Sequence, residues 1–255
     1  MRIYLSAVFE SAISQDKLKE IINDAYVLHS FAYFNENYSE LYSLCKDVML
    51  DSGAFTVMNS VKSRSNFNPM EYCRKYANHI KKYDIKHFIE LDIEGVYGFD
   101  VYKDCLHQLQ DITGRDPIYV FHKWRGLNYF DELVKKYDYI ALGDVSVGKG
   151  SREIYKYFPY FLNKAHQNNC KVHGLAFTSI SDLRYMQFDS VDSSSWKSGD
   201  RFAHPFRFDG HNVNQYNCKR NDERKLDKGN IVQEHDFLEW KKLAIYFDKE
   251  YEPIW

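Results

Sequence analysis

Eight short segments rich in β-branched and aromatic residues recur along this 255-residue chain, each followed by a loop and a stretch with helical periodicity. They are RIYLSAVF (2–9), AYVLHSFAY (25–33), DVMLD (47–51), HFIELDI (87–93), PIYVFH (117–122), DYIALGD (138–144), KVHGLAF (171–177) and FDSVDSS (188–194). Strands that alternate with helices pair in parallel, and eight of them can close into a barrel without an exposed sheet edge. We therefore predict an α/β fold, a single (β/α)8 TIM barrel over residues 1–255, with a doubly wound open sheet as the second choice.

Helical patterns fill the intervals between these strands. They lie at residues 14–24, 68–83, 101–112, 127–137 and 152–167, with a last one at 234–247. Asn68 is a suitable N-cap, and Pro69 after it suits the first helical position. Residues 199–230 are too many for a plain connection, so we expect a loop insertion there before the last helix.

Composition narrows the class of protein. Hydrophobic residues make up 44% of the chain and charged residues 27%, which favours a large core and excludes a disordered chain. The net charge of -2 gives no general attraction to polyanions. The five cysteines are scattered without a Cys-x-x-Cys pair, which indicates reduced thiols in a cytoplasmic protein. We expect no signal peptide, no membrane span and no cysteine-rich zinc cluster.

Polar residues stand at the ends of several predicted strands, where the catalytic groups of a (β/α)8 barrel gather. The strand-end residues are Asp51, Asp92, His122, Gly143, Asp144, His173 and Asp192. Any single aspartate could instead cap the following helix, and for Asp51 in VMLDSGAF the sequence supports capping and catalysis about equally. Packing does not explain so many strand-end carboxylates together.

Four motifs occur in a fixed order over residues 48–196: LDSGAF, LDIEG, HGLAFTS and SVDSSSW. Together they resemble the tRNA-guanine transglycosylase superfamily, and most closely its small phage-type branch, the DNA 7-deazaguanine transglycosylase-like proteins. The resemblance implies that Asp192 attacks the anomeric carbon of a nucleoside and that Asp51 moves protons at the base. It also implies that Asp92 and Gly143 hydrogen-bond the base and that Phe55 stacks on it.

The chemistry is reasonable for these residue types. Cleavage of an N-glycosidic bond passes through an oxocarbenium-like state, which a carboxylate below the sugar can stabilise or trap covalently. A second carboxyl group must handle protons on the base, and two carboxylates in one pocket push their pKa values apart. Asp192 and Asp51 are the candidates for this pair. His122, Asp144 and His173 complete the predicted base-binding set.

The chain departs from the tRNA enzymes in three respects. Their structural zinc subdomain is missing, because only Cys218 remains after the last strand, so we expect no metal and no cofactor. His122 stands where they place a glutamine, as expected in the phage-type branch, and ALGDVSVG differs from their glycine motif. DNA is therefore a better expected substrate than tRNA. A free 7-deazaguanine is the expected incoming base, and the alternative is a hydrolytic DNA glycosylase that removes a modified base from phage DNA.

Cations and aromatic residues recur in the loops after the predicted strands. The predicted nucleic-acid-binding residues are Lys62, Arg64, Lys123, Trp124, Arg125, Lys149, Arg152, Trp196, Lys197 and Arg201. A basic rim with aromatic platforms suits a nucleic acid whose single base is flipped into the pocket. The alternative is that these are ordinary solvated loop residues.

Two readings compete with a nucleobase enzyme. A catalytically inactive barrel could bind nucleic acid or a partner, but a binder of polyanions gains nothing from three buried aspartates. A glycoside hydrolase would also use paired carboxylates, with Glu90 and Glu94 as the candidates near the fourth strand.

Overall fold

Eight parallel strands form one curled sheet in the computed structural model, which describes residues 1–59, 67–143, 155–177, 179–199, 204–216 and 229–251. The strands are β1 (Arg2–Ser6), β2 (Tyr26–Ser30), β3 (Asp47–Asp51), β4 (His87–Phe88), β5 (Tyr119–Phe121), β6 (Tyr139–Leu142), β7 (Lys171–Gly174) and β8 (Ser190–Ser193). Their order is β4-β3-β2-β1-β8-β7-β6-β5, so β4 and β5 are the two ends of the sheet.

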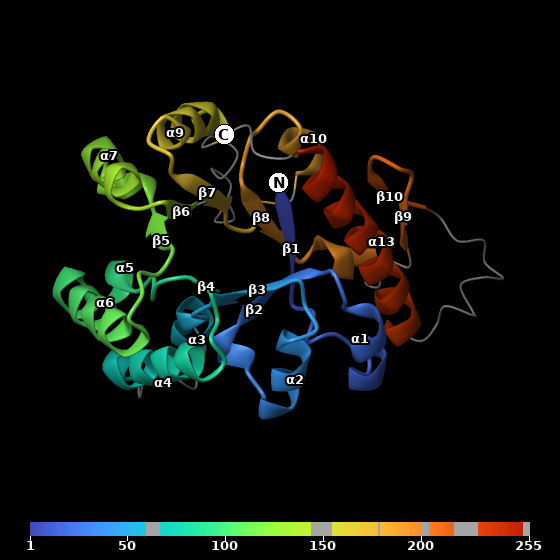
Figure 1. Ribbon diagram of the computed structural model, residues 1–255, viewed down its shortest axis with the longest axis horizontal. Coiled ribbons are helices and arrows are strands. Elements are labelled where there is room, and N and C mark those ends of the chain that lie inside the picture. Colours follow the sequence, from blue (N-terminus) through green and yellow to red (C-terminus); the bar gives the residue numbers. More distant parts are fainter. Residues whose placement is uncertain (60–66, 144–154, 178, 200–203, 217–228, 252–255) are drawn as a thin grey trace.

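The sheet closes between β4 and β5. Ile89 pairs with Ile118 in a parallel bridge. The Ile118 N–H donates to the Phe88 carbonyl at 2.8 Å, and the Glu90 N–H donates to the Ile118 carbonyl at 3.2 Å. The chain is thus the predicted (β/α)8 barrel (Figure 1).

Helices surround the strands on the outside (Figure 1). They are α1 (Gln15–Ile21), α2 (Ser39–Tyr42), α3 (Ala54–Asn59), α4 (Pro69–Lys82), α5 (Glu94–Tyr97), α6 (Phe99–Thr113), α7 (Leu127–Lys136), α9 (Phe158–His166), α10 (Ile180–Leu183) and α13 (Gly229–Glu250). Short 3-10 turns are η1 (Phe31–Tyr33), η2 (Glu36–Tyr38), η3 (Lys123–Arg125) and η4 (Ser195–Lys197). The predicted cap of α4 is confirmed: Asn68 accepts the Glu71 N–H at 3.1 Å, with Pro69 next to it.

Side chains alternate between the inside and the outside of the barrel, as they must along a strand. A core cluster within the barrel includes Tyr4, Leu28, Met49, Val120 and Ala141. Larger clusters pack the outer faces of the strands against the helices, for example around Phe130, Phe161 and Phe237. The next residues of inward parity, one layer toward the C-terminal ends of the strands, are Ser6, Ser30, Asp51, His122, Gly143 and Asp192.

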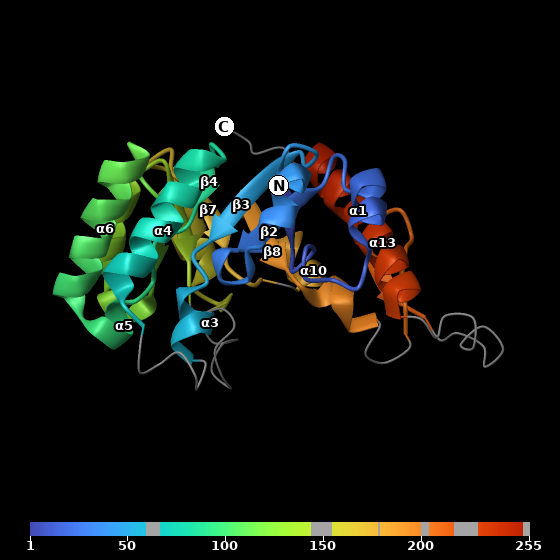
Figure 2. The same ribbon diagram turned by 90° about the horizontal axis from the view of Figure 1, so that it is seen from below.

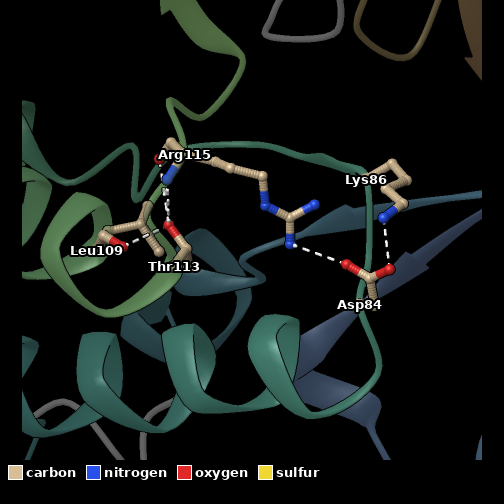
Figure 3. A network of polar contacts seen from close by, with 5 residues as sticks. All are labelled: Asp84, Lys86, Leu109, Thr113 and Arg115. Atoms are coloured by element: carbon tan, nitrogen blue, oxygen red, sulfur yellow. Dashed lines mark hydrogen bonds and ion pairs between the residues drawn. The ribbon is translucent and has the colours of Figure 1, made fainter.

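At the N-terminal ends of β4 and β5, a polar network joins the two loops that precede these strands (Figure 3). Arg115 lies 3.7 Å from Asp84, which also pairs with Lys86. The Thr113 hydroxyl donates to the Leu109 carbonyl at 2.7 Å in the last turn of α6, and Gly114 in the left-handed conformation ends the helix just before Arg115. The Arg115 guanidinium also lies 5.6 Å from the centre of the Phe88 ring. These contacts tie the α4–β4 loop to the α6–β5 loop.

The predicted insertion at 199–230 contains a small hairpin in its described part. Strands β9 (Phe206–Phe208) and β10 (Val213–Gln215) pair antiparallel. The Phe206 N–H donates to Asp236 of α13 at 2.7 Å, and its ring packs edge-on against Trp240. The hairpin therefore lies on the last helix. Residues 200–203 and 217–228 of the insertion lie outside the described residues.

Within the described ranges, no helix is both long enough and apolar enough to span a membrane.

Candidate active site

The candidate site lies at the C-terminal ends of the strands, where α3, α5 and α10 follow β3, β4 and β7 on one side of the barrel (the lower side in Figure 2). Asp51 is the last residue of β3, and Asp192 is the third residue of β8. Strand pairing places Ser30 beside Asp51 and Tyr4 beside Asp192. The two predicted catalytic aspartates thus share one end of the barrel.

Asp192 is buried and held by neutral donors. The Ser6 hydroxyl donates to its Oδ2 at 2.7 Å, and the Ala176 N–H donates to its Oδ1 at 2.6 Å. Ala176 has a φ of 52 degrees, in the left-handed region that non-glycine residues rarely adopt. This backbone conformation follows β7 directly and turns the N–H toward the carboxylate.

His173, the third residue of β7, lies buried next to Asp192 and is not exposed at the strand ends. The imidazole is fully buried, and its Nε2 lies 3.4 Å from Asp192 Oδ1. Its Nδ1 lies 2.5 Å from the Ser190 hydroxyl, which in turn contacts the Tyr139 hydroxyl. If each hydroxyl donates along this chain, Nδ1 is the acceptor and the Nε2 proton faces Asp192. His173 Nε2 then faces the carboxylate without forming a hydrogen bond to it.

Asp51 combines an Asx-type turn contact, made before α3 begins, with a perturbed pKa. Its Oδ2 accepts the Gly53 N–H at 3.0 Å, just before α3 begins. The pKa of Asp51 is raised to about 6, chiefly by burial and also by the negative charges of Asp192 and Asp92, while the Gly53 N–H and the Ser30 hydroxyl oppose the shift. The electrostatic influence of Asp192 and Asp92 indicates that the three carboxylates belong to one site.

The Asp92–His122 pair forms the next part of the site. His122 Nε2 lies 2.7 Å from Asp92 Oδ2. The His122 ring packs directly on Gly143, where an added Cβ would lie only 2.6 Å from Cε1 of the imidazole. Gly143 therefore makes room for the histidine ring at the end of β6. The structure brings these three predicted base-binding residues together.

The expected extent of the fourth strand is wrong. We expected a strand over residues 87–93 ending near Asp92, whereas β4 covers only His87–Phe88. Beyond the Ile89 bridge, the side chain of Glu90 takes the Val120 N–H at 2.9 Å, in place of the backbone acceptor that a continuing ladder would offer. Asp92 therefore lies on a segment that has left the sheet.

Several predicted residues lie outside what the structure describes. These are Asp144, Lys62, Arg64, Lys149, Arg152, Arg201 and the side chain of Phe55. Their assignment to the base or to nucleic acid stays a prediction.

The described rim residues differ in their surroundings. Trp124 is 57% exposed, and its ring is nearly parallel to that of His122 with centroids 5.9 Å apart. Lys123 is exposed, with its ammonium 5.0 Å from the centre of the Tyr157 ring. Both side chains are exposed to solvent in the loop after β5.

Three other predicted rim residues are engaged within the protein. Trp196 is fully buried and donates to the Ser6 carbonyl at 2.8 Å. Lys197 donates to the Glu10 carbonyl at 3.2 Å. The side chain of Arg125 is only 5% exposed and pairs with Glu94. These contacts hold the loops after β1, β4, β5 and β8 around the site.

Sequence reasoning missed Ser6, Ser30 and Ala176. The two serines were detectable, because each is the strand-end residue of inward parity in its strand. Ala176 contributes through its backbone N–H and a positive φ, and neither property can be recognised from an alanine in the sequence.

Glu90 and Glu94, the candidate carboxylates for a glycoside hydrolase, are both engaged in contacts within the protein. Glu90 is 1% exposed and accepts the Tyr102 hydroxyl at 2.6 Å as well as the Val120 N–H. Glu94 pairs with Arg125. Within the described part of the chain, no three His, Cys, Asp or Glu side chains form a group that could hold a metal ion.

Comparison with known proteins gives no further assignment. No protein-family model matches the chain, and no curated protein is significantly similar to it in sequence.

Proposed function

We propose that this protein cleaves the N-glycosidic bond of a base in DNA, with Asp192 as the nucleophile, and exchanges that base as transglycosylases do. The observation that carries the proposal is the contrast between two neighbouring carboxyl groups. Asp192 accepts hydrogen bonds from Ser6 and Ala176, and His173 Nε2 lies 3.4 Å from it. Asp51 has a pKa raised to about 6. One group is arranged to act as an anion and the other to carry a proton, which is the division of roles that glycosidic cleavage needs.

The first half-reaction forms a bond between a carboxylate oxygen of Asp192 and C1′ of the nucleotide. The bond from C1′ to the base nitrogen breaks, and its electron pair leaves with the base. Protonated Asp51 gives its proton to the departing base. The products are a free base, ionised Asp51 and a sugar esterified to Asp192.

In the second half-reaction, the nitrogen of an incoming base attacks C1′ and displaces Asp192. The proton of that nitrogen passes to Asp51, which restores both carboxyl groups. A free 7-deazaguanine is the incoming base that the resemblance implies. If water attacks instead, the product is an abasic site and the protein is a DNA glycosylase.

Features at the mouth of the barrel favour a nucleic-acid substrate. Trp124 offers an exposed indole next to His122, and stacking of a base on an aromatic ring is tolerant of sequence. Lys123 adds an exposed cation in the same loop. DNA with one base turned out of its stack would place that base over Asp192 and Asp51.

The test is mass spectrometry of the bases released from plain and 7-deazaguanine-modified DNA, with and without free bases in solution. We expect release that depends on a free 7-deazaguanine, which then appears in the DNA. Release with matching abasic sites and no added base would replace exchange by hydrolysis. Asp192→Ala is the control, and release by that variant would overturn the proposal.

A further inference from the structure

The seam is the line along which β4 and β5 meet. Beyond the Ile89–Ile118 bridge, toward the C-terminal ends of the strands, side chains join the two segments instead of a backbone ladder. The ladder ends at Ile118, whose N–H and carbonyl bond the chain on either side of Ile89. In a parallel pair the next donor, the Val120 N–H, would bond the Glu90 carbonyl. Here it bonds the Glu90 carboxylate, at 2.9 Å. The main chain after Glu90 is thereby free to diverge from β5.

Two further carboxylates cross the same seam at two-residue intervals. Asp92 pairs with His122 at 2.7 Å, and Glu94 pairs with Arg125. The residues between them, Leu91 and Ile93, are buried in the cluster beneath α4 and α6. The stretch ELDIE (90–94) therefore uses its three acidic side chains to bridge the seam and its apolar ones to anchor the segment.

Arg125 connects the outer two bridges. Its Nη1 donates to the Tyr129 hydroxyl at 2.6 Å, and its guanidinium lies 4.9 Å from the centre of the Tyr102 ring. Tyr102 donates to Glu90 Oε2 at 2.6 Å. One buried cation thus contacts Glu94 directly and reaches Glu90 through the tyrosine. In the sequence, Asp92 lies midway between the two carboxylates of this network, Glu90 and Glu94.

The planar guanidinium suits this place better than an ammonium would. Its Cζ lies 5.4 and 4.9 Å from the ring centres of Trp124 and Tyr129, and the same group pairs with Glu94. A lysine would keep the charge and lose both the stacking and the fixed fork of donors. Arg125→Lys therefore perturbs the geometry of the network while retaining its charge.

We propose that Arg125, together with Glu90 and Glu94, is a positioning residue that fixes the Asp92–His122 pair, and that this fixed pair determines which base the site accepts. The second half of this inference rests on the proposed function. The first half concerns the free protein and can be judged without any activity.

The first experiment is NMR of the histidine side chains of the free protein. A His122 Nε2 proton hydrogen-bonded to Asp92 is expected to give a ring N–H signal, assigned by its loss in His122→Asn. We expect Arg125→Lys to shift or broaden this signal. The matched control is Arg115→Lys, which alters the arginine at the other end of the same seam, where it pairs with Asp84 and lies on Phe88 (Figure 3). An unchanged signal in Arg125→Lys, or an equal change in Arg115→Lys, would overturn the positioning role.

The second experiment measures base release by both variants. For Arg125→Lys we expect KM for the preferred substrate to rise about tenfold, kcat to change less than about threefold, and discrimination between bases to narrow. Arg115→Lys should match the wild type in KM, in kcat and in discrimination between bases. Equal loss of kcat for every base with discrimination intact would show a merely structural role. If the wild type releases no base, the proposed function fails while the NMR result still decides whether Arg125 positions the pair.

Discussion

At the end of β3, the Asp51 carboxylate accepts the Gly53 N–H and also faces the charges of Asp192 and Asp92. The sequence left capping and catalysis as alternatives for Asp51, and the contact observed is an Asx-type turn that precedes α3, which is compatible with proton transfer by the same side chain. Gly53 makes this possible: its φ is 65 degrees, and an added Cβ would lie 2.5 Å from both Ala32 Cβ and Ser30 Oγ. Glycine thus fixes the turn that aims its N–H at Asp51.

The raised pKa of Asp51 predicts a pH dependence of base release. Below a pH of about 6 the carboxyl group is protonated in the folded protein and can act as the acid, and above it the proton is lost. We expect kcat/KM to fall roughly tenfold per pH unit above this value, and Asp51→Asn to lower it at least about 100-fold at pH 6. The measurement is the pH profile of base release by both proteins. A profile that is flat from pH 5 to 8, or a limb that survives in Asp51→Asn, would contradict the role as acid.

Individual residues differ in how well sequence alone identifies them. Asp51, Asp92 and Asp192 stand out because acidic side chains are costly at the ends of buried strands. The engagement of Arg125 and Trp196 inside the protein could not be foreseen, because a loop sequence does not tell whether a large side chain turns toward solvent or toward the core. Both were expected at the nucleic-acid interface, and both instead hold loops together.

At the scale of elements, all eight predicted strands are present, and the largest difference is in β4. Residues 87–93 alternate like a strand, and the alternation is real in the fold, since Glu90 and Asp92 both reach across the seam while Leu91 is buried between them. What sequence cannot show is whether a carboxylate or a carbonyl accepts the next N–H. That choice ends β4 at Phe88 and frees the segment that carries Asp92.

Burial of Glu90 in this seam predicts a pH dependence of stability. Desolvation raises the pKa of Glu90 from 4.5 to about 7, although Tyr102 and Val120 oppose the shift. The folded protein therefore holds this proton more tightly than the unfolded chain, and stability is lost as pH rises from about 4.5 through about 7. The loss at Glu90 amounts to roughly 3 kcal/mol.

The measurement is the free energy of unfolding of the wild type and of Glu90→Gln, by urea denaturation between pH 4.5 and 8. Glutamine does not titrate, so the difference between the two proteins isolates Glu90 from other groups. We expect the variant to be the less stable protein at low pH, where it loses a hydrogen-bond acceptor. As pH rises, the free energy of unfolding of the wild type should fall by roughly 3 kcal/mol relative to that of the variant. Two parallel curves would contradict the assigned ionisation.

At the scale of the whole molecule, the two ends of the barrel have different tasks. At the end where the strands begin, Tyr4 donates to Asp47, which also pairs with His87, and the network of Arg115 and Asp84 joins the adjacent loops. At the other end the inward positions hold Asp51 and Asp192. The barrel was predictable because strand and helix patterns alternate along the sequence. Contacts between the loops at its mouth were not, because they depend on loop conformations.

The most direct test of the nucleophile is to detect a covalent bond between Asp192 and DNA. The protein is incubated with substrate DNA in the absence of free base, denatured, and examined by intact-mass and peptide mass spectrometry. We expect an adduct equal to the protein plus a strand that has lost one base, mapped to the peptide containing Asp192 and absent in Asp192→Asn. An adduct on another residue, or base release by Asp192→Asn at the wild-type rate, would contradict nucleophilic catalysis by Asp192.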